Sequence, residues 1–134
     1  MIKRVKAFLP EAKINSEEYR GYIENFESEI LRGISTLAIL AIIERSGKEG
    51  IYGYALLKQL EQETQNMLIL EEGTMYPILK KLEKECIVAS NKQSHEGRPR
   101  NYYTITESGR GVFNHLMGFL TKLIDSMGSI MGIE

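Results

Sequence analysis

The feature that most constrains the fold of this chain is a helix-forming segment, residues 71–85, followed at residues 97–106 by a β-prone segment. The first segment has apolar residues at helical spacing with lysines between them, which predicts an amphipathic helix with a basic outer face. The second has Gly97 and Pro99 ahead of a pair of tyrosines, which predicts a turn and a strand. A short basic helix followed by a hairpin is typical of a recognition helix and its wing.

The helix at residues 71–85 has two distinct faces when its residues are placed at about 100° intervals. The inner face has Leu79 at its centre and is apolar, with Met75, Ile78, Leu82 and Cys86. The outer face has small residues, a phenol and ammonium groups that suit a DNA groove: Gly73, Thr74, Tyr76, Pro77, Lys80, Lys81 and Lys84. Local rules alone would begin this helix at Pro77, because proline lacks an N–H and disfavours helical geometry at the preceding residue.

The distribution of charge favours the same region. The whole chain has a formal net charge of −1, which by itself argues against nucleic acid. Residues 73–110, however, contain seven Lys or Arg against four Glu, a local charge of +3, whereas residues 1–30 and 31–72 are slightly acidic. We therefore expect DNA binding that is limited to one surface and sensitive to salt.

The length of 134 residues predicts one domain with a sizeable core. The single cysteine, Cys86, cannot form an intramolecular disulfide, which suits a reducing cytosol. No segment has the uncharged run of about 20 residues that a bilayer crossing requires. We expect a cytoplasmic protein without a membrane partner.

The first third of the chain predicts an arm and one or two helices. Residues 1–14 have no clear period and contain a proline, so a loosely ordered arm is expected. Asn15 or Ser16 is suited to cap a helix whose apolar face has Tyr19, Tyr22, Ile23, Phe26 and Ile30. Residues 31–43 are apolar almost all round, which predicts a buried helix. Gly33 is the only candidate break, and the sequence leaves open whether the two helices are continuous.

The segments on either side of the recognition helix complete a small domain. Residues 47–53 predict a turn with a very short strand, and residues 54–64 predict the first helix of a helix-turn-helix pair. Residues 87–92 and 101–105 are β-prone. The polar segment 93–100 between them predicts a hairpin with a mobile basic tip.

The last segment, residues 106–134, predicts a long helix that joins two subunits. Thr106 with Glu107 is typical of a helix start. Apolar residues then recur at alternating spacings of three and four, as in a coiled coil: Phe113, Leu116, Leu120, Leu123, Met127 and Ile130. Met117, Ile124 and Met131 widen this stripe beyond what one small domain needs to cover, so we expect a second subunit to bury it.

Together these segments predict a mainly α fold with a small β-hairpin, a winged helix-turn-helix with an N-terminal helix and a long C-terminal dimerisation helix. The expected parts are an arm at residues 1–14, a DNA-binding domain at residues 15–105 and the dimerisation helix at residues 106–134. The sequence resembles the PadR family of transcription regulators in a series of motifs: Leu31-Arg32-Gly33, Tyr52-Gly53-Tyr54, Gly73-Thr74-Met75-Tyr76-Pro77 with Leu79-Lys80-Lys81-Leu82-Glu83, and Gly97-Arg98-Pro99-Arg100-Asn101-Tyr102-Tyr103 with Thr106-Glu107-Ser108-Gly109-Arg110.

The resemblance implies a homodimer that represses transcription by binding a roughly palindromic operator and that releases it when a small-molecule effector binds. It places Pro77 inside the recognition helix, against the local rule. The residues it implies for DNA contact are Thr74, Tyr76, Pro77, Lys80, Lys81 and Lys84 on the helix, and Arg98, Arg100 and Tyr102 on the wing. For the dimer interface it implies the C-terminal stripe with help from the N-terminal helix, where Tyr22 and Phe26 are the candidates.

Two positions depart from the family pattern. Glu71 stands where a Ser or another helix-capping residue is common, and it adds an anion near the expected DNA surface. Cys86 stands where a Gly commonly ends the helix, which would place it in a left-handed backbone conformation. The C-terminal helix also has no tryptophan, so the aromatic pocket of some drug-sensing members is not expected here.

Other functions have less support in the sequence. No phosphate-binding Gly-rich loop, nucleophile elbow or Cys–His–acid arrangement points to an enzyme. His95 and His115 have no partners at metal-ligand spacing, so neither a metal nor a cofactor is expected. Cys86 is expected to be a small buried residue rather than a redox sensor. The alternative function is a winged helix that only contacts proteins, but basic groups on both helix and wing argue against it.

Overall fold

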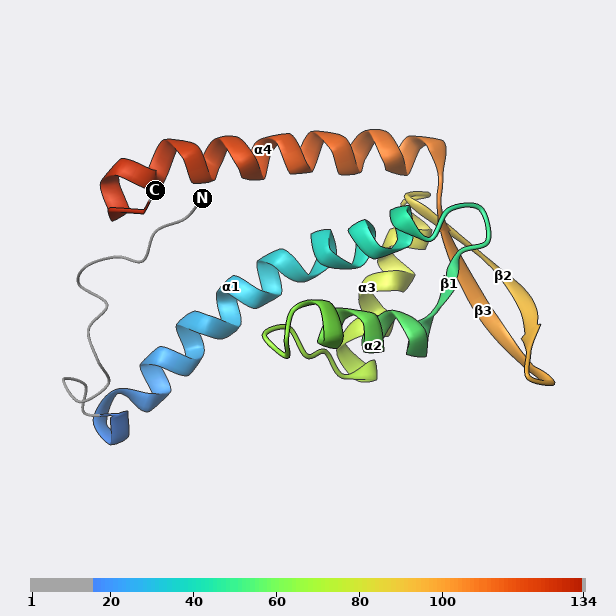
Figure 1. Cartoon of the computed structure of the whole chain (residues 1–134), viewed down its shortest axis with the longest axis horizontal. Helices are drawn as coiled ribbons and strands as arrows, with labels where there is room; N and C mark the ends of the chain where they lie inside the picture. The colour runs from blue at the N-terminus through green and yellow to red at the C-terminus, as the bar shows by residue number, and fades with distance from the viewer. Residues whose placement is uncertain (1–15, 134) are drawn as a thin grey trace.

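The computed structural model describes residues 16–133 of the chain. These residues form a winged helix-turn-helix, as the sequence predicted (Figure 1). The three strands form one antiparallel sheet in the order β1-β3-β2. The arm expected at residues 1–14 and the cap at Asn15 lie outside the described residues. The elements in chain order are α1 (Ser16–Arg45), β1 (Ile51–Tyr52), α2 (Gly53–Glu63), α3 (Glu72–Lys84), β2 (Val88–His95), β3 (Arg98–Ile105) and α4 (Glu107–Met131).

The N-terminal part is one continuous helix of 30 residues, so the question left open at Gly33 is settled. At 1.5 Å per residue, α1 is roughly 45 Å long. Its second half lies in the centre of the domain, where Ile39, Leu40 and Ile43 are fully buried. Its first half extends away from the rest of the domain and leaves most of its side chains exposed (Figure 1).

One core joins α1, α2, α3 and the sheet. Its members lie at the inward positions of each element: Ile39, Leu40, Ile42, Ile43, Ile51, Leu56, Leu57, Leu60, Leu68, Met75, Leu79, Leu82, Val88 and Tyr103. Burial of this apolar surface is the main stabilising term, at about 25 cal/mol for each Å² removed from water. Two ion pairs connect α1 to its neighbours, Arg45 with Glu63 of α2 at 2.6 Å and Glu44 with Arg110 of α4 at 2.8 Å.

The recognition helix begins at Glu72, so the local rule that placed its start at Pro77 is wrong. Pro77 lies inside α3, and its missing N–H leaves the carbonyl of Gly73 without the usual partner four residues later. Because this carbonyl lies in the first turn, the helix loses only one hydrogen bond, and that bond is close to its N-terminus. Met75, at 0% exposed, precedes Pro77 and already lies on the buried face of α3 with Leu79, at 1% exposed.

The end of α3 is a Schellman motif centred on Cys86. Cys86 has φ +61°, its N–H donates to the carbonyl of Glu83 at 3.0 Å, and the N–H of Ile87 donates to the carbonyl of Leu82 at 2.9 Å. The left-handed conformation expected from the departure at this position is therefore confirmed. The expected burial of Cys86 on the inner face is wrong, since the residue is exposed just beyond the helix end.

The hairpin is longer and tighter than the sequence predicted. β2 and β3 pair continuously from Val88 with Ile105 to His95 with Arg98. Only Glu96 and Gly97 form the turn, with φ of +52° and +79°, as in a type I′ turn. The loop predicted at residues 93–100 is therefore wrong. A type I′ turn matches the right-handed twist of the two strands, so the strands can pair through these polar residues as far as the turn.

The junction between the wing and α4 is tightly packed. The Thr106 hydroxyl accepts a hydrogen bond from the N–H of Gly109 at 2.9 Å, which confirms the expected helix start. The same hydroxyl donates to the carbonyl of Cys86 at 2.6 Å. A Cβ on Gly109 would collide with the backbone carbonyl of Ile87, so α4 can approach the end of α3 this closely only with glycine at position 109.

The two long helices lie close together near the sheet and diverge toward the other end (Figure 1). As a result, much of the apolar surface of α4 and of the first half of α1 is not covered within this chain. No helix in residues 16–133 is both long enough and apolar enough to cross a bilayer.

Candidate nucleic-acid interface

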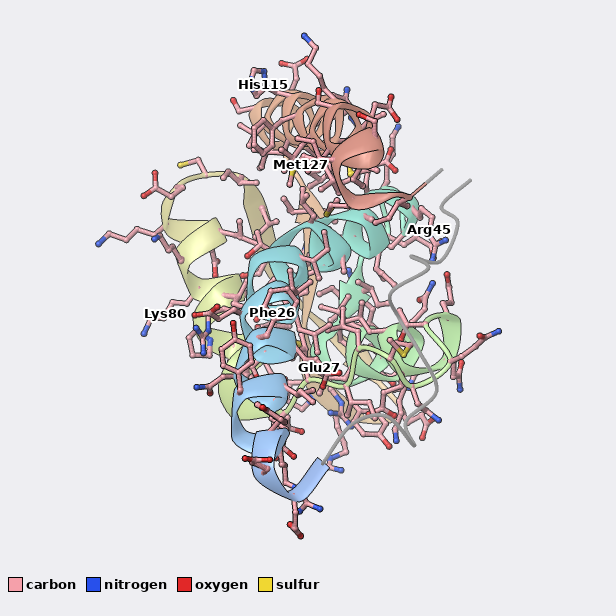
Figure 2. The ribbon with its side chains drawn as sticks, turned by 90° about the vertical axis from the view of Figure 1, so that its left-hand side faces the viewer. Phe26, Glu27, Arg45, Lys80, His115 and Met127 are labelled. Atoms are coloured by element: carbon pink, nitrogen blue, oxygen red, sulfur yellow. The ribbon has the colours of Figure 1, made fainter. Side chains whose placement is uncertain are left out.

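The outer face of α3 has the composition that the helical wheel predicted. Met75, Leu79 and Leu82 are buried and Ile78 is half-buried. The six residues expected to contact DNA are all exposed: Thr74, Tyr76, Pro77, Lys80, Lys81 and Lys84. Figure 2 shows Lys80 on the side of α3 that points away from α1. This face of α3 is therefore accessible to the groove of a DNA duplex.

The cations of this surface are not neutralised within the described part of the chain. The ion pairs among residues 16–133 involve other basic groups: Arg20, Arg45, Lys58, His95 and Arg110. Glu83, which lies between two of the lysines, instead accepts a hydrogen bond from the hydroxyl of Ser90 at 2.7 Å. The basic groups on α3 and the wing that pair with no carboxylate of residues 16–133 are Lys80, Lys81, Lys84, Lys92, Arg98 and Arg100.

The recognition helix and the wing meet at a small polar cavity of about 200 Å³. Tyr76 of α3 and Arg100 of β3 both line it, with Gly53 at the start of α2. A Cβ on Gly53 would overlap the hydroxyl of Tyr76, so the end of the Tyr76 side chain occupies the space beside this glycine.

The wing residues differ in their exposure to solvent. Arg98 is exposed next to the turn, whereas Arg100 and Tyr102 are half-buried. The guanidinium of Arg100 lies over the ring of Tyr52, 5.1 Å from its centroid, and Tyr102 packs on the same ring at 5.4 Å between centroids. Tyr102 is thus engaged in a cluster on the outer face of the sheet, and only part of it is accessible.

His95 also belongs to this cluster, which was not predicted from the sequence. Its Nε2 lies 3.4 Å from the hydroxyl of Tyr52, and its Nδ1 lies 3.4 Å from the hydroxyl of Tyr102. The alternation of side chains along paired strands would have placed His95 and Tyr102 on one face. The local pattern did not indicate that the strand pairing continues to His95, because residues 90–94, which precede it in β2, are polar.

Two ionisable groups are shifted by their surroundings. Burial raises the pKa of Tyr103, with smaller contributions from Tyr76 and Glu83 nearby, so its phenol stays protonated. Hydrogen bonds from the Arg45 side chain lower the pKa of Glu63, with help from Gln59. Within the described residues, no three His, Cys, Asp or Glu side chains gather in a metal-binding arrangement.

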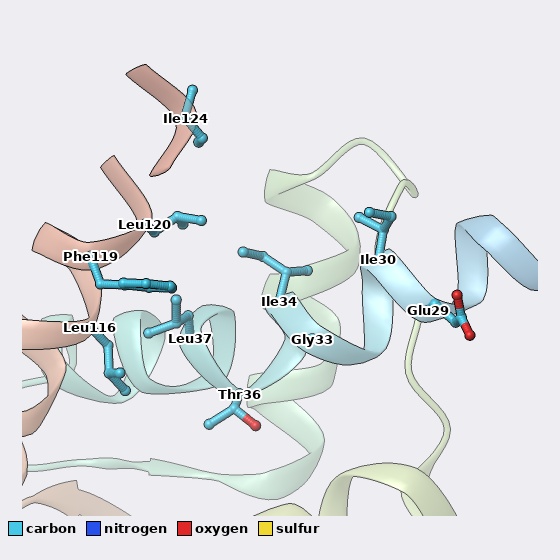
Figure 3. A pocket seen from close by; sticks show the side chains of 10 residues that line it. All are labelled: Glu29, Ile30, Gly33, Ile34, Thr36, Leu37, Leu116, Phe119, Leu120 and Ile124. Carbon is cyan, nitrogen blue, oxygen red and sulfur yellow. The ribbon is translucent and has the colours of Figure 1, made fainter. Parts of the chain in front are cut away.

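A separate apolar groove of about 620 Å³ lies between α1 and α4 (Figure 3). Leu116, Phe119 and Leu120 face it from α4, and Ile34 and Leu37 face it from α1. Figure 2 shows that Met127 also lies on the side of α4 toward α1, whereas His115 lies on the opposite side. The groove continues the apolar stripe that the sequence predicted for α4.

The residues expected at a dimer interface divide into two groups. Phe113 packs against the core of its own chain, and Leu116 and Leu120 are half-buried. The others are exposed: Leu123, Ile124, Met127, Ile130, Tyr22 and Phe26. Ile130 and Tyr22 are 81% and 76% exposed. Phe119, at 60% exposed, was not among the expected residues because it lies beside the strict three-and-four spacing.

The model of the transcriptional regulator PadR-like family matches residues 39–115, which include the C-terminal end of α1, all of α2 and α3, the wing and the start of α4. This chain belongs to the PadR-like family. It is therefore a DNA-binding transcriptional regulator, and the resemblance found in the sequence motifs is confirmed.

Solved PadR-family structures share most of this architecture. A PadR family transcriptional regulator from Eggerthella lenta is 27% identical, with a TM-score of 0.74 over 86% of this chain and 96% of that one. A PadR-like transcription factor from Bacteroides fragilis is 26% identical, with a TM-score of 0.63 over 79% of this chain and 98% of that one. An uncharacterised protein from Lysinibacillus sphaericus is 32% identical over 67% of this chain and 81% of its own length.

Proposed function

We propose that this PadR-like protein is a repressor that binds a pseudo-palindromic operator as a homodimer. The observation that carries the proposal is the set of cations on α3 and the wing that no carboxylate of residues 16–133 neutralises. Unpaired Lys and Arg on two adjacent elements suit a polyphosphate, because each contact releases a counterion from the DNA. The outer face of α3 enters the major groove, and Arg98 and Arg100 contact the flanking backbone or minor groove.

A second copy of the chain is the proposed occupant of the apolar surface on α1 and α4. Exposed apolar side chains on both helices favour an interface that is continuous with the groove between them. Two-fold symmetry requires that the same surface on both copies forms the contact. The dimer then presents two copies of α3, and their separation selects two half-sites about 34–36 Å apart.

The proposal includes a small-molecule effector of unknown identity. A ligand lowers DNA affinity only by binding more tightly to a dimer whose recognition helices are wrongly spaced. The groove between α1 and α4 is the proposed location, because a molecule held there would change the angle between the two helices. Its lining is apolar apart from Glu29 and Thr36, so an apolar molecule with few polar groups fits it best.

The direct test is selection of duplexes from a random pool by the purified protein, followed by sequencing. We expect an inverted repeat whose half-sites are centred about one helical turn apart. A selected sequence without two-fold symmetry would contradict the dimeric arrangement. The absence of binding to any duplex at low salt would contradict DNA binding itself and would favour the alternative, a winged helix that contacts only proteins.

Polar substitution of the α4 stripe should separate the subunits. In the Leu120→Gln/Leu123→Gln variant, each subunit places two amides in a surface that the proposal buries, at a cost of roughly 1–3 kcal/mol for each unpaired group. We expect sedimentation at micromolar concentration to give a monomer. The matched control is His115→Gln/Lys122→Gln, in which both changed residues are exposed and His115 lies on the side of α4 away from α1. If the Leu120→Gln/Leu123→Gln variant and its control are both dimeric, the apolar stripe of α4 is not the dimer interface.

A further inference from the structure

The end of the wing is supported less by the sheet than its base. β1 pairs with β3 only at Ile51 with Tyr103 and Tyr52 with Tyr102. Beyond Tyr52, the hairpin continues toward its turn as a ribbon of two strands. A two-stranded ribbon is marginally stable on its own, so the basic residues near its turn need another support to keep a fixed position.

His95 supplies such a support across the face of the sheet. It lies on β2 next to the turn, while Tyr52 lies on β1 at the far side of β3. The two rings are 4.9 Å apart between centroids at an angle of 38°, and Nε2 of His95 lies 3.4 Å from the Tyr52 hydroxyl. The other ring nitrogen lies 3.4 Å from the Tyr102 hydroxyl. One side chain thereby connects all three strands.

Arg100 depends on the same tyrosine. Its guanidinium lies over the Tyr52 ring, where the face of the ring attracts a cation. Its Nε is shielded from solvent and has no hydrogen-bond partner among the residues that the structure describes. No carboxylate of those residues pairs with it either. Among the described residues, stacking on Tyr52 is therefore the interaction that holds the arginine, and its terminal Nη groups, unlike Nε, remain available to an external anion.

We propose that His95 is a positioning residue for DNA binding: it fixes the Tyr52 ring from one side so that the ring holds the Arg100 guanidinium toward a phosphate. The inference rests on the proposed function, because it gives Arg100 a phosphate to bind. It predicts that His95 affects DNA affinity through Arg100 and not through general stability. The side chain acts by contact with Tyr52 and Tyr102, so its own charge is not required.

A double-mutant cycle with His95→Ala and Arg100→Ala in the full-length protein tests this. The probe is the duplex selected by the wild-type protein, and all four proteins are measured in the same buffer. We expect His95→Ala alone to weaken binding about 3- to 10-fold. We also expect it to flatten the dependence of log affinity on log salt by about 0.9 for each phosphate that Arg100 no longer neutralises. In the Arg100→Ala background, the same substitution should change neither quantity.

The outcomes separate this inference from the proposed function. Equal effects of His95→Ala with and without Arg100 would overturn it, because the histidine would then act independently of the arginine. An unchanged salt dependence in His95→Ala would overturn it as well. If His95→Ala fails to fold, His95→Ser takes its place in the cycle, since it also removes the ring from Tyr52 and both polar contacts. A wild-type protein that binds no duplex would instead overturn the proposed function.

Discussion

The Lys80→Ala/Lys84→Ala variant should bind every duplex much more weakly than the wild-type protein. Both lysines lie on the exposed face of α3, and neither pairs with a carboxylate of residues 16–133. A dimer would lose four phosphate contacts, each with a net contribution of about 0.5–1.5 kcal/mol, so affinity should fall on the order of a hundredfold or more. The log–log salt dependence should flatten by about 0.9 for each contact, hence by roughly 3 to 4 units.

Fluorescence anisotropy over a series of salt concentrations measures both quantities. The control is Lys48→Ala/Lys122→Ala, which removes the same charge from exposed positions outside α3 and the wing. It should leave the salt dependence close to that of the wild type. Equal losses of DNA affinity in the two variants would mean that only the total charge matters. The outer face of α3 would then no longer be the proposed DNA-contacting surface.

Gly109→Ala should destabilise the fold although alanine favours a helix. A Cβ at this position would collide with the backbone carbonyl of Ile87, and a backbone atom cannot move aside as the end of a flexible side chain can. That carbonyl also accepts from the N–H of Thr106 at 3.1 Å, so a shift would disturb the start of α4 as well. We expect a loss of about 1–3 kcal/mol in the free energy of unfolding, or somewhat more.

Urea unfolding at a fixed protein concentration measures this loss, because the stability of a dimer depends on concentration. Gly111→Ala is the matched control, since it lies in the same helix and a Cβ there would meet no atom within 4 Å. It should raise the free energy of unfolding by up to about 1 kcal/mol through helix propensity. A Gly109→Ala midpoint at or above that of the wild type would show that the junction with Ile87 is not rigid.

Most of the fold follows from local patterns in the sequence. The spacing of apolar residues predicted the buried half of α1, α2, the inner face of α3 and the long α4, because each helix must bury one side. Thr106 predicted the start of α4, and the capping hydrogen bond to Gly109 agrees with it. The same spacing identified the outer face of α3, where the exposed lysines lie.

Two errors occurred where contacts distant in sequence overrule local preference, and a third occurred at the end of a helix. Pro77 is unfavourable for a helix by itself, but burial of Met75 and Leu79 against the core keeps α3 helical on both sides of it. Polar residues near the turn suggested a loop, yet the strand ladder and a type I′ turn extend the hairpin to His95. Cys86 matched the apolar period of α3 but follows its last turn, where the Schellman motif turns it outward.

The sequence by itself determined the order of the elements, the inner and outer faces of the helices and the region that carries local positive charge, because these depend on the spacing of neighbours along the chain. Only the tertiary structure decided that α1 is continuous, that Gly109 lies where a Cβ would collide with backbone, and that His95, Tyr52, Tyr102 and Arg100 share one surface. These features depend on the register of paired strands and on the distance between packed backbones. Neither quantity is encoded in the local period of a sequence.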